Sequence, residues 1–195
     1  MLSGLRELDF VSSVITTDGS EVVIPFRLSV LVVAESYFSP GYLSSLIASS
    51  RPSLERLYLS SLRNDDSQSI ASAPSLPFPR LERLTFVEPS APCLGIIAGC
   101  PKLERLSFAM VPDDFPFSIL HQHIASLSKS TLLRLWLDLG IITRKQVQEL
   151  VDTPSLRNLE SLQIRSRRAM RPCNVKIVEA IKGKEGKLTV EMMSF

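Results

Sequence analysis

Residues 54–59 read LERLYL, and the same hexapeptide pattern returns as LERLTF at residues 81–86 and as LERLSF at residues 103–108. Looser copies of the pattern L-x-x-L-x-L, with other apolar residues allowed, begin at Leu5, Leu28, Leu132 and Leu159. Successive first leucines are therefore 23, 26, 27, 22, 29 and 27 residues apart. Self-similarity at this period is the signature of a repeat architecture.

The apolar positions within each copy alternate as they do in a short strand, so they point into one core. A single copy cannot bury its own leucines, and stacking of neighbouring copies supplies the stability. The predicted fold class is thus an α/β solenoid, with parallel strands on a concave face and helices and loops on the convex side. We expect one domain over residues 1–195, built of seven repeats and a degenerate closing strand near 187–192, where Leu188 and Val190 follow Leu162 and Ile164 by 26 residues.

Several of the segments that return from one strand to the next have the apolar spacing of helices. Ser39 and Pro40 suit an N-cap and a first helical residue, while Thr143 and Gln146 fit a capping box. Residues 11–25 and 62–78 lack this periodicity and are predicted loops. The apolar faces expected on the convex side are Leu43, Leu46 and Ile47; Leu94 and Ile97; Phe117, Leu120, Ile124 and Leu127; Val147, Leu150 and Val151; and Val178 and Ile181 after an Asn174 cap.

Composition is that of a globular protein, with 45% hydrophobic and 22% charged residues among 195. The net charge of +2 divides into −3 for residues 1–98 (7 basic, 10 acidic) and +5 for residues 99–195 (15 basic, 10 acidic). No secretory signal or apolar run of membrane-spanning length is apparent, so a membrane partner is not expected. Cys93, Cys100 and Cys173 form no C-x-x-C pair and are predicted to be reduced thiols, which favours a cytoplasmic or nuclear protein.

Residues 99–108, GCPKLERLSF, contain a C-P-x-L-x-x-L run that resembles the cysteine-containing class of leucine-rich repeats. Residues 51–54 and 153–156 echo this run without the cysteine. The irregular repeat lengths and the L-E-R-L cores resemble the repeat halves of fungal F-box proteins. That resemblance implies a substrate receptor of a ubiquitin ligase. No F-box precedes Leu5, so we expect either a part of a longer chain or a relative that binds no ligase adaptor.

The third, fifth and seventh positions of the repeat are expected on the concave face. Two interpretations remain open: a solvated face on which Glu55, Glu82 and Glu104 neutralise the arginines, or a surface for an acidic ligand with aromatic anchors. Among the fifth-position residues we single out Trp136, the one tryptophan of the chain. The candidate binding residues are Arg56, Tyr58, Arg83, Arg105, Arg134, Trp136 and Gln163.

A second candidate is the basic cluster Arg165, Arg167, Arg168 and Arg171, which suggests nucleic-acid binding as the alternative function. A solvated loop is the simpler interpretation because no aromatic residue is interleaved with these arginines. His121 and His123 are two residues apart and would face different ways on a helix, so no metal is expected. No catalytic motif occurs, so we predict a non-enzymatic module without cofactor that binds another protein, either as a monomer or within a longer chain.

Overall fold

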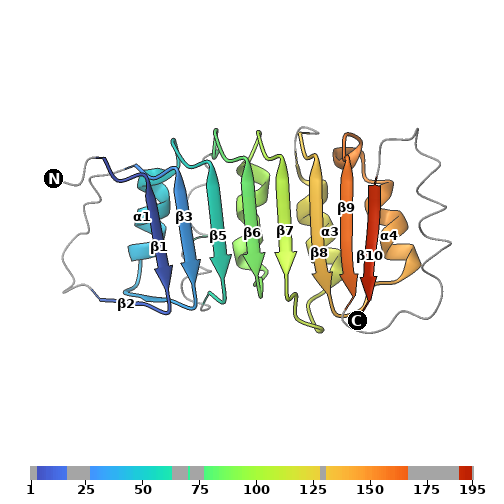
Figure 1. The fold of residues 1–195 in the computed structure, drawn as a ribbon, viewed down its shortest axis with the longest axis horizontal. Coiled ribbons are helices and arrows are strands. Elements are labelled where there is room, and N and C mark those ends of the chain that lie inside the picture. Colours follow the sequence, from blue (N-terminus) through green and yellow to red (C-terminus); the bar gives the residue numbers. More distant parts are fainter. Residues whose placement is uncertain are drawn as a thin grey trace.

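The computed structural model describes residues 4–16, 27–62, 70, 77–127, 131–166 and 189–194. One eight-stranded sheet has the order β1-β3-β5-β6-β7-β8-β9-β10, which is also the order along the chain, and all its neighbours are parallel (Figure 1). This confirms the predicted α/β solenoid. The strands are β1 (Glu7–Val11), β3 (Val30–Ala34), β5 (Arg56–Ser60), β6 (Arg83–Val87), β7 (Arg105–Ala109), β8 (Arg134–Leu139), β9 (Ser161–Ser166) and β10 (Thr189–Ser194).

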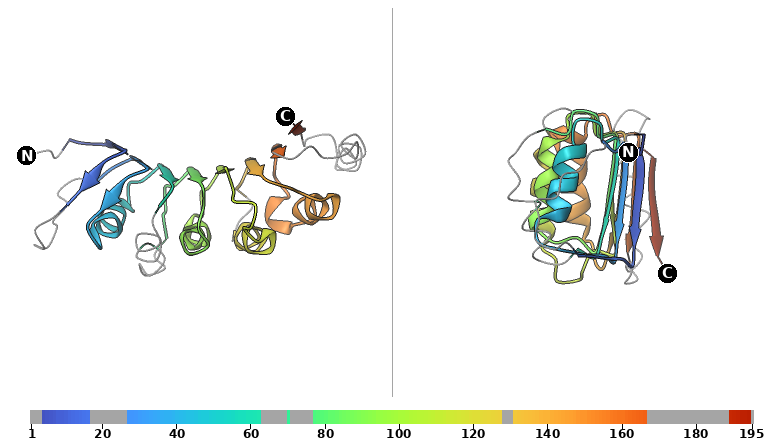
Figure 2. Two further views of the ribbon diagram at one scale, coloured as in Figure 1. Left: turned by 90° about the horizontal axis from the view of Figure 1, so that it is seen from below. Right: turned by 90° about the vertical axis from the view of Figure 1, so that its left-hand side faces the viewer.

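The helices cover one face of the sheet and leave the other face open along its inner curve (Figure 2). A separate two-stranded parallel sheet pairs β2 (Val14–Ile15) with β4 (Tyr37–Phe38). The convex side thus carries the return segments, as the repeat pattern predicts. Its helices are α1 (Tyr42–Ser50), η1 (Pro92–Gly99), α3 (Phe117–Ala125), α4 (Arg144–Val151) and η2 (Pro154–Leu156).

The core is a stack of the repeat leucines, one layer for each strand. In β5, Leu57 and Leu59 are each 2% exposed, whereas Tyr58 between them is half-buried on the other face. The rings of Phe86 and Phe108 stack across β6 and β7 with centroids 5.5 Å apart. Burial of this apolar ladder is the main stabilising term, at roughly 1.5–3 kcal/mol for each large side chain.

Two helices differ from their predicted form. Helix α1 begins after Gly41, which has a left-handed φ of 79°, rather than at Ser39 and Pro40, so the predicted cap was wrong. Glycine adopts this φ at little cost, which lets the chain turn sharply before the helix. Segment η1 is a 3₁₀ helix. It belongs to the shortest repeat, and a 3₁₀ helix covers more length for each residue than an α-helix does.

The capping box at the start of α4 is confirmed. The Gln146 backbone N–H donates to Thr143 Oγ1 at 3.3 Å, and the Thr143 N–H donates to Gln146 Oε1 at 2.8 Å. Two backbone groups that helix geometry leaves without intrahelical partners are thereby satisfied.

We therefore expect Thr143→Ala to lower the free energy of unfolding by about 1 kcal/mol, within the usual range of about 0.5–2 kcal/mol for a lost N-cap. Urea denaturation followed by circular dichroism measures the change. Thr143→Ser keeps the hydroxyl oxygen and serves as the control. Equal losses for the two variants would contradict a capping role.

The closing strand is shifted from its predicted register. Val190 lies opposite Leu162 and Met192 opposite Ile164, whereas the repeat spacing had placed Leu188 and Val190 there. The error is two residues, and a two-residue shift keeps every side chain on its original face of a strand. Sequence pattern alone therefore does not distinguish the two registers. The predicted Asn174 cap and the apolar face after it lie outside the described residues.

Five strands end in the same unusual way. The residues that follow β1, β3, β5, β6 and β7 have φ values between 48° and 51°, although none is glycine: Ser12, Glu35, Ser61, Glu88 and Met110. This left-handed turn lets the N–H of Glu88 donate to the carbonyl of Ala109 at 3.0 Å as the chain leaves the sheet. Strands β8 and β9 run one residue further, with Leu139 opposite Ser166. Their extra length continues the pairing past the seventh repeat position.

Candidate binding surface on the concave face

The arginines at the third repeat position form one row across four strands. Arg56 lies opposite Arg83, Arg83 opposite Arg105, and Arg105 opposite Arg134. Neighbouring strands are about 4.8 Å apart, so the row is about 14 Å long. We call these four residues the arginine row. Their alignment is the one that the repeat spacing predicts.

Nearby glutamates do not neutralise the arginine row through ion pairs. The salt bridges among the described residues are Lys145–Glu149 and Arg165–Asp138, and neither involves the row. Glu55, Glu82 and Glu104 are exposed at position two, one residue before each strand begins. No ion pair between these glutamates and the arginine row is therefore present in the part of the chain that the structure describes.

The glutamates at position two instead contribute through their backbone. The carbonyl of Glu55 accepts from the N–H groups of Glu82 and Arg83, at 2.9 and 3.1 Å. The carbonyl of Glu104 accepts from Leu133 and Arg134 in the same way, at 2.9 and 3.0 Å. These paired bonds fix the backbone at the start of each strand. The arginine row consequently projects from a rigid base.

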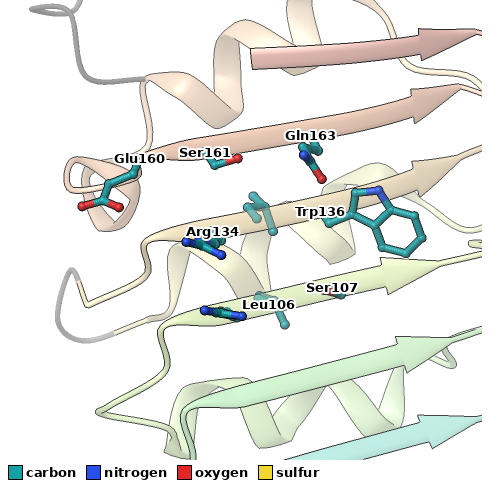
Figure 3. A pocket seen from close by; sticks show the side chains of 9 residues that line it. Leu106, Ser107, Arg134, Trp136, Glu160, Ser161 and Gln163 are labelled. Carbon is teal, nitrogen blue, oxygen red and sulfur yellow. The ribbon is translucent and has the colours of Figure 1, made fainter. Parts of the chain in front are cut away.

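Beside the arginine row runs a second row from the fifth repeat position. Its order is Tyr58, Thr85, Ser107, Trp136 and Gln163. Tyr58 and Trp136 thus flank two small residues, and all five side chains are partly exposed. Figure 3 shows the indole of Trp136 standing out from β8, with Ser107 and Gln163 on the adjacent strands. The two aromatic rings therefore border a low stretch of the surface over Thr85 and Ser107.

A shallow depression of about 790 Å³ lies where the two rows cross β7, β8 and β9 (Figure 3). Four of the predicted binding residues line this depression: Arg105, Arg134, Trp136 and Gln163. The other three, Arg56, Tyr58 and Arg83, lie outside its lining on β5 and β6. Glu160 and Ser161 were missed, although they hold positions two and three of the repeat that begins at Leu159. The lining residues are Arg105, Leu106, Ser107, Arg134, Leu135, Trp136, Glu160, Ser161 and Gln163.

The predicted basic cluster is not gathered in the described structure. Arg165 lies on β9 with one guanidinium nitrogen 3.7 Å from Oδ2 of Asp138, whose side chain is only 4% exposed. The pair sits at the seventh repeat position, where Asp138 is directly opposite Arg165. Their spacing of 27 residues, one repeat, was the sequence signal for this cross-strand pair. Arg167, Arg168 and Arg171 lie outside the described residues.

The histidines lie on the convex side. The Nε2 atom of His121 is 2.8 Å from Thr153 Oγ1, and its ring stacks on Phe117 with centroids 6.0 Å apart. Burial lowers the pKa of His123 below its ordinary value. Residues 4–16, 27–62, 70, 77–127, 131–166 and 189–194 contain no group of three His, Cys, Asp or Glu side chains that could hold a metal ion.

Two cysteines are buried as free thiols in the core. Burial raises the pKa of Cys93, and it raises the pKa of Cys100 to about 12. The Cys100 thiol donates to the carbonyl oxygen of Ile96 at 3.1 Å. Since the thiolate is the reacting species, both groups are held in an unreactive form near neutral pH.

We expect iodoacetamide at pH 8 to leave Cys93 and Cys100 unmodified in the folded protein and to alkylate both in urea. The reason is that pH 8 lies far below the raised pKa of Cys100, whereas an unfolded thiol has a pKa of about 8.5. Mass spectrometry of a Cys173→Ser variant measures the labelling without the third cysteine. Rapid alkylation of Cys100 before unfolding would contradict its burial.

A sequence model for the leucine-rich repeats of FBD-associated F-box protein At5g56370 matches residues 26–183. This range contains six of the eight main strands, β3 to β9. The matched family is plant-type, so the fungal resemblance is not supported. Searches of curated proteins and of solved structures gave no match. Within the described residues, the helices are too short or too polar to cross a membrane.

Proposed function

Because the chain belongs to the family of leucine-rich repeats found in FBD-associated F-box proteins, we propose that it is a non-catalytic module whose concave face binds a partner protein. One observation carries the proposal: four arginines without ion pairs to described acids lie beside partly exposed Tyr58 and Trp136 on one sheet. Arginine, tryptophan and tyrosine are the residues that most often dominate the energy of protein interfaces.

The finer proposal is that the partner is the substrate of a ubiquitin ligase. In this role the repeats select the substrate, and an F-box would bind the ligase adaptor. The family match supports this division of labour, since it relates these repeats to those of an F-box protein. The module needs only to hold its partner near the ligase. No covalent step is assigned to its own residues.

Nucleic-acid binding by the arginine-rich C-terminal half has weaker support. Arg165, the one member of that cluster among the described residues, already faces the buried carboxylate of Asp138. A phosphate contact by Arg165 would have to compete with that pair. Recognition of nucleic acid also depends on many phosphate contacts, and its affinity falls steeply with salt.

The proposal is tested by affinity isolation and mass spectrometry from cells that express the full-length protein. Wild type is compared with Arg134→Ser/Trp136→Ala on the concave face and with Lys145→Ser on the convex face. Lys145 is 87% exposed, so its variant removes a positive charge without touching the concave rows. We expect at least one partner to be recovered with wild type and Lys145→Ser and to be depleted about tenfold or more with the concave variant.

Partner turnover tests the ligase role separately. If the repeats select a degradation substrate, the partner's half-life should lengthen in cells that carry the concave variant. Equal recovery of every partner by all three proteins would overturn the proposed surface. An unchanged half-life for a partner that the concave variant loses would leave the interaction standing and reject the ligase role.

A further inference from the structure

The arginines of the third repeat position are confined to four strands. In the third repeat position, the row is preceded by Val30 on β3 and followed by Ser161 on β9. Further out, Glu7 and Asp9 lie on the edge strand β1 and are exposed, as is Glu160 at the rim of the depression. The arginine row is therefore a short basic segment with acidic residues beyond each end. A long polyanion laid across the strands would meet these acids.

Resting on the proposed function, we infer that the partner contributes a short acidic segment in extended conformation, which crosses β5 to β8 with its carboxylates on the arginine row. The lengths agree. Alternate side chains of an extended peptide lie about 6.8 Å apart on the same side, so acids at positions one, three and five span about 14 Å. The four arginines span about the same distance, at about 4.8 Å for each strand.

The neighbouring row gives the segment its place and its direction. Thr85 and Ser107 are small and leave room for a backbone between Tyr58 and Trp136. Trp136 follows the last arginine of the row by two residues on β8, and its indole points along the strand away from Arg134 (Figure 3). An apolar residue that directly follows the third acid faces the side of the segment opposite to the acids, where it reaches the indole. Guanidinium groups bind carboxylates through two parallel N–H donors, which favours acids over neutral polar residues.

The experiment uses the intrinsic fluorescence of Trp136, which is the one tryptophan in the chain and lies within the surface to be tested. The probe is a synthetic seven-residue peptide with aspartates at positions one, three and five and leucine at position six. A matched peptide carries asparagine in place of each aspartate. A third peptide has the same composition with its three aspartates adjacent. Calorimetric titration of the full chain provides a second measure of binding.

We expect saturable binding of the alternating aspartate peptide and at least tenfold weaker binding of the asparagine peptide. The peptide with adjacent aspartates should also bind more weakly, because its acids point to both sides. Arg105→Ser and Arg134→Ser should each weaken binding about tenfold or more. Arg157→Ser is the matched control, since it removes an exposed arginine that follows η2, away from the sheet, and it should leave the affinity unchanged.

Two results would overturn the inference. One is equal affinity for the aspartate and asparagine peptides, or no binding of either in both measurements. The other is preferential binding of a ten-nucleotide oligothymidylate with a steep loss of affinity in salt, which would assign the arginine row to nucleic acid. If the peptides fail while the concave variant still loses a partner in cells, protein recruitment stands without the acidic segment. If no partner depends on the concave face, the proposed function itself fails.

Discussion

Replacing Phe108 with alanine is expected to lower the free energy of unfolding by about 3–5 kcal/mol, the usual cost of removing a large aromatic ring from a packed core. Phe108 is completely buried, and its ring stacks on Phe86 with an interplanar angle of 14°. Its loss removes contacts from two neighbouring repeats at once. Because the solenoid is stabilised by the interfaces between repeats, the centre of the sheet should be the costliest place for a cavity. Urea denaturation monitored by circular dichroism measures the change.

The adjacent residue provides the control for Phe108. Ser107 points to the opposite face, so Ser107→Ala should change stability by no more than about 0.5 kcal/mol. A double-mutant cycle with Phe86→Ala should show a coupling of about 0.5–1.5 kcal/mol from the ring pair. A loss below about 1 kcal/mol for Phe108→Ala would be too small for a fully buried phenylalanine. Such a result would contradict the inward orientation of that side chain.

Leu135→Ala and Trp136→Ala should have opposite effects on stability and binding. Leu135 is 1% exposed, so its truncation should cost about 2–5 kcal/mol of stability through a core cavity. Trp136 is half-buried on the concave face, and its truncation should cost less than about 1 kcal/mol of stability. For partner binding, losing an aromatic anchor should instead cost about 2 kcal/mol or more.

Both measurements use the same two variants, with unfolding followed in urea and partner affinity followed by calorimetry under folding conditions. Thermal denaturation confirms that each variant is folded at the temperature of the binding experiment. If Trp136→Ala destabilised the protein as much as Leu135→Ala does, the tryptophan would belong to the core. The concave surface would then lose its principal anchor.

The sheet was predictable from sequence because its geometry repeats. One apolar pattern fixes which residues of each strand face the core, and a constant position within the pattern brings Arg56, Arg83, Arg105 and Arg134 into one row. Insertions between copies change the convex side and do not disturb this alignment. The repeat pattern therefore located the concave residues without any knowledge of the loops.

The features that sequence reasoning missed depend on contacts outside the pattern. The Asp138–Arg165 pair joins two residues that differ in type from the other members of their repeat position. The start of α1 depends on the left-handed backbone of Gly41. Ser39 and Pro40 are more typical residues for a helix start, and the prediction therefore placed the start at them. The expected pairing of Glu55, Glu82 and Glu104 with the arginines rested on their being adjacent in sequence, and no such ion pair occurs among the described residues.

The strands of the main sheet lie side by side in the same order in which they occur along the chain, and this order has a consequence for protein synthesis. Each strand of the main sheet pairs with the strands before and after it in sequence, so no strand waits for a distant partner. A ribosome takes about 1–5 s to add a repeat of about 27 residues, at about 5–20 residues per second. Loop closure and helix formation take about a microsecond or less. Once enough repeats have been made to form a stable stack, we therefore expect each new strand to pair with the edge of that stack while the rest of the chain is still being translated.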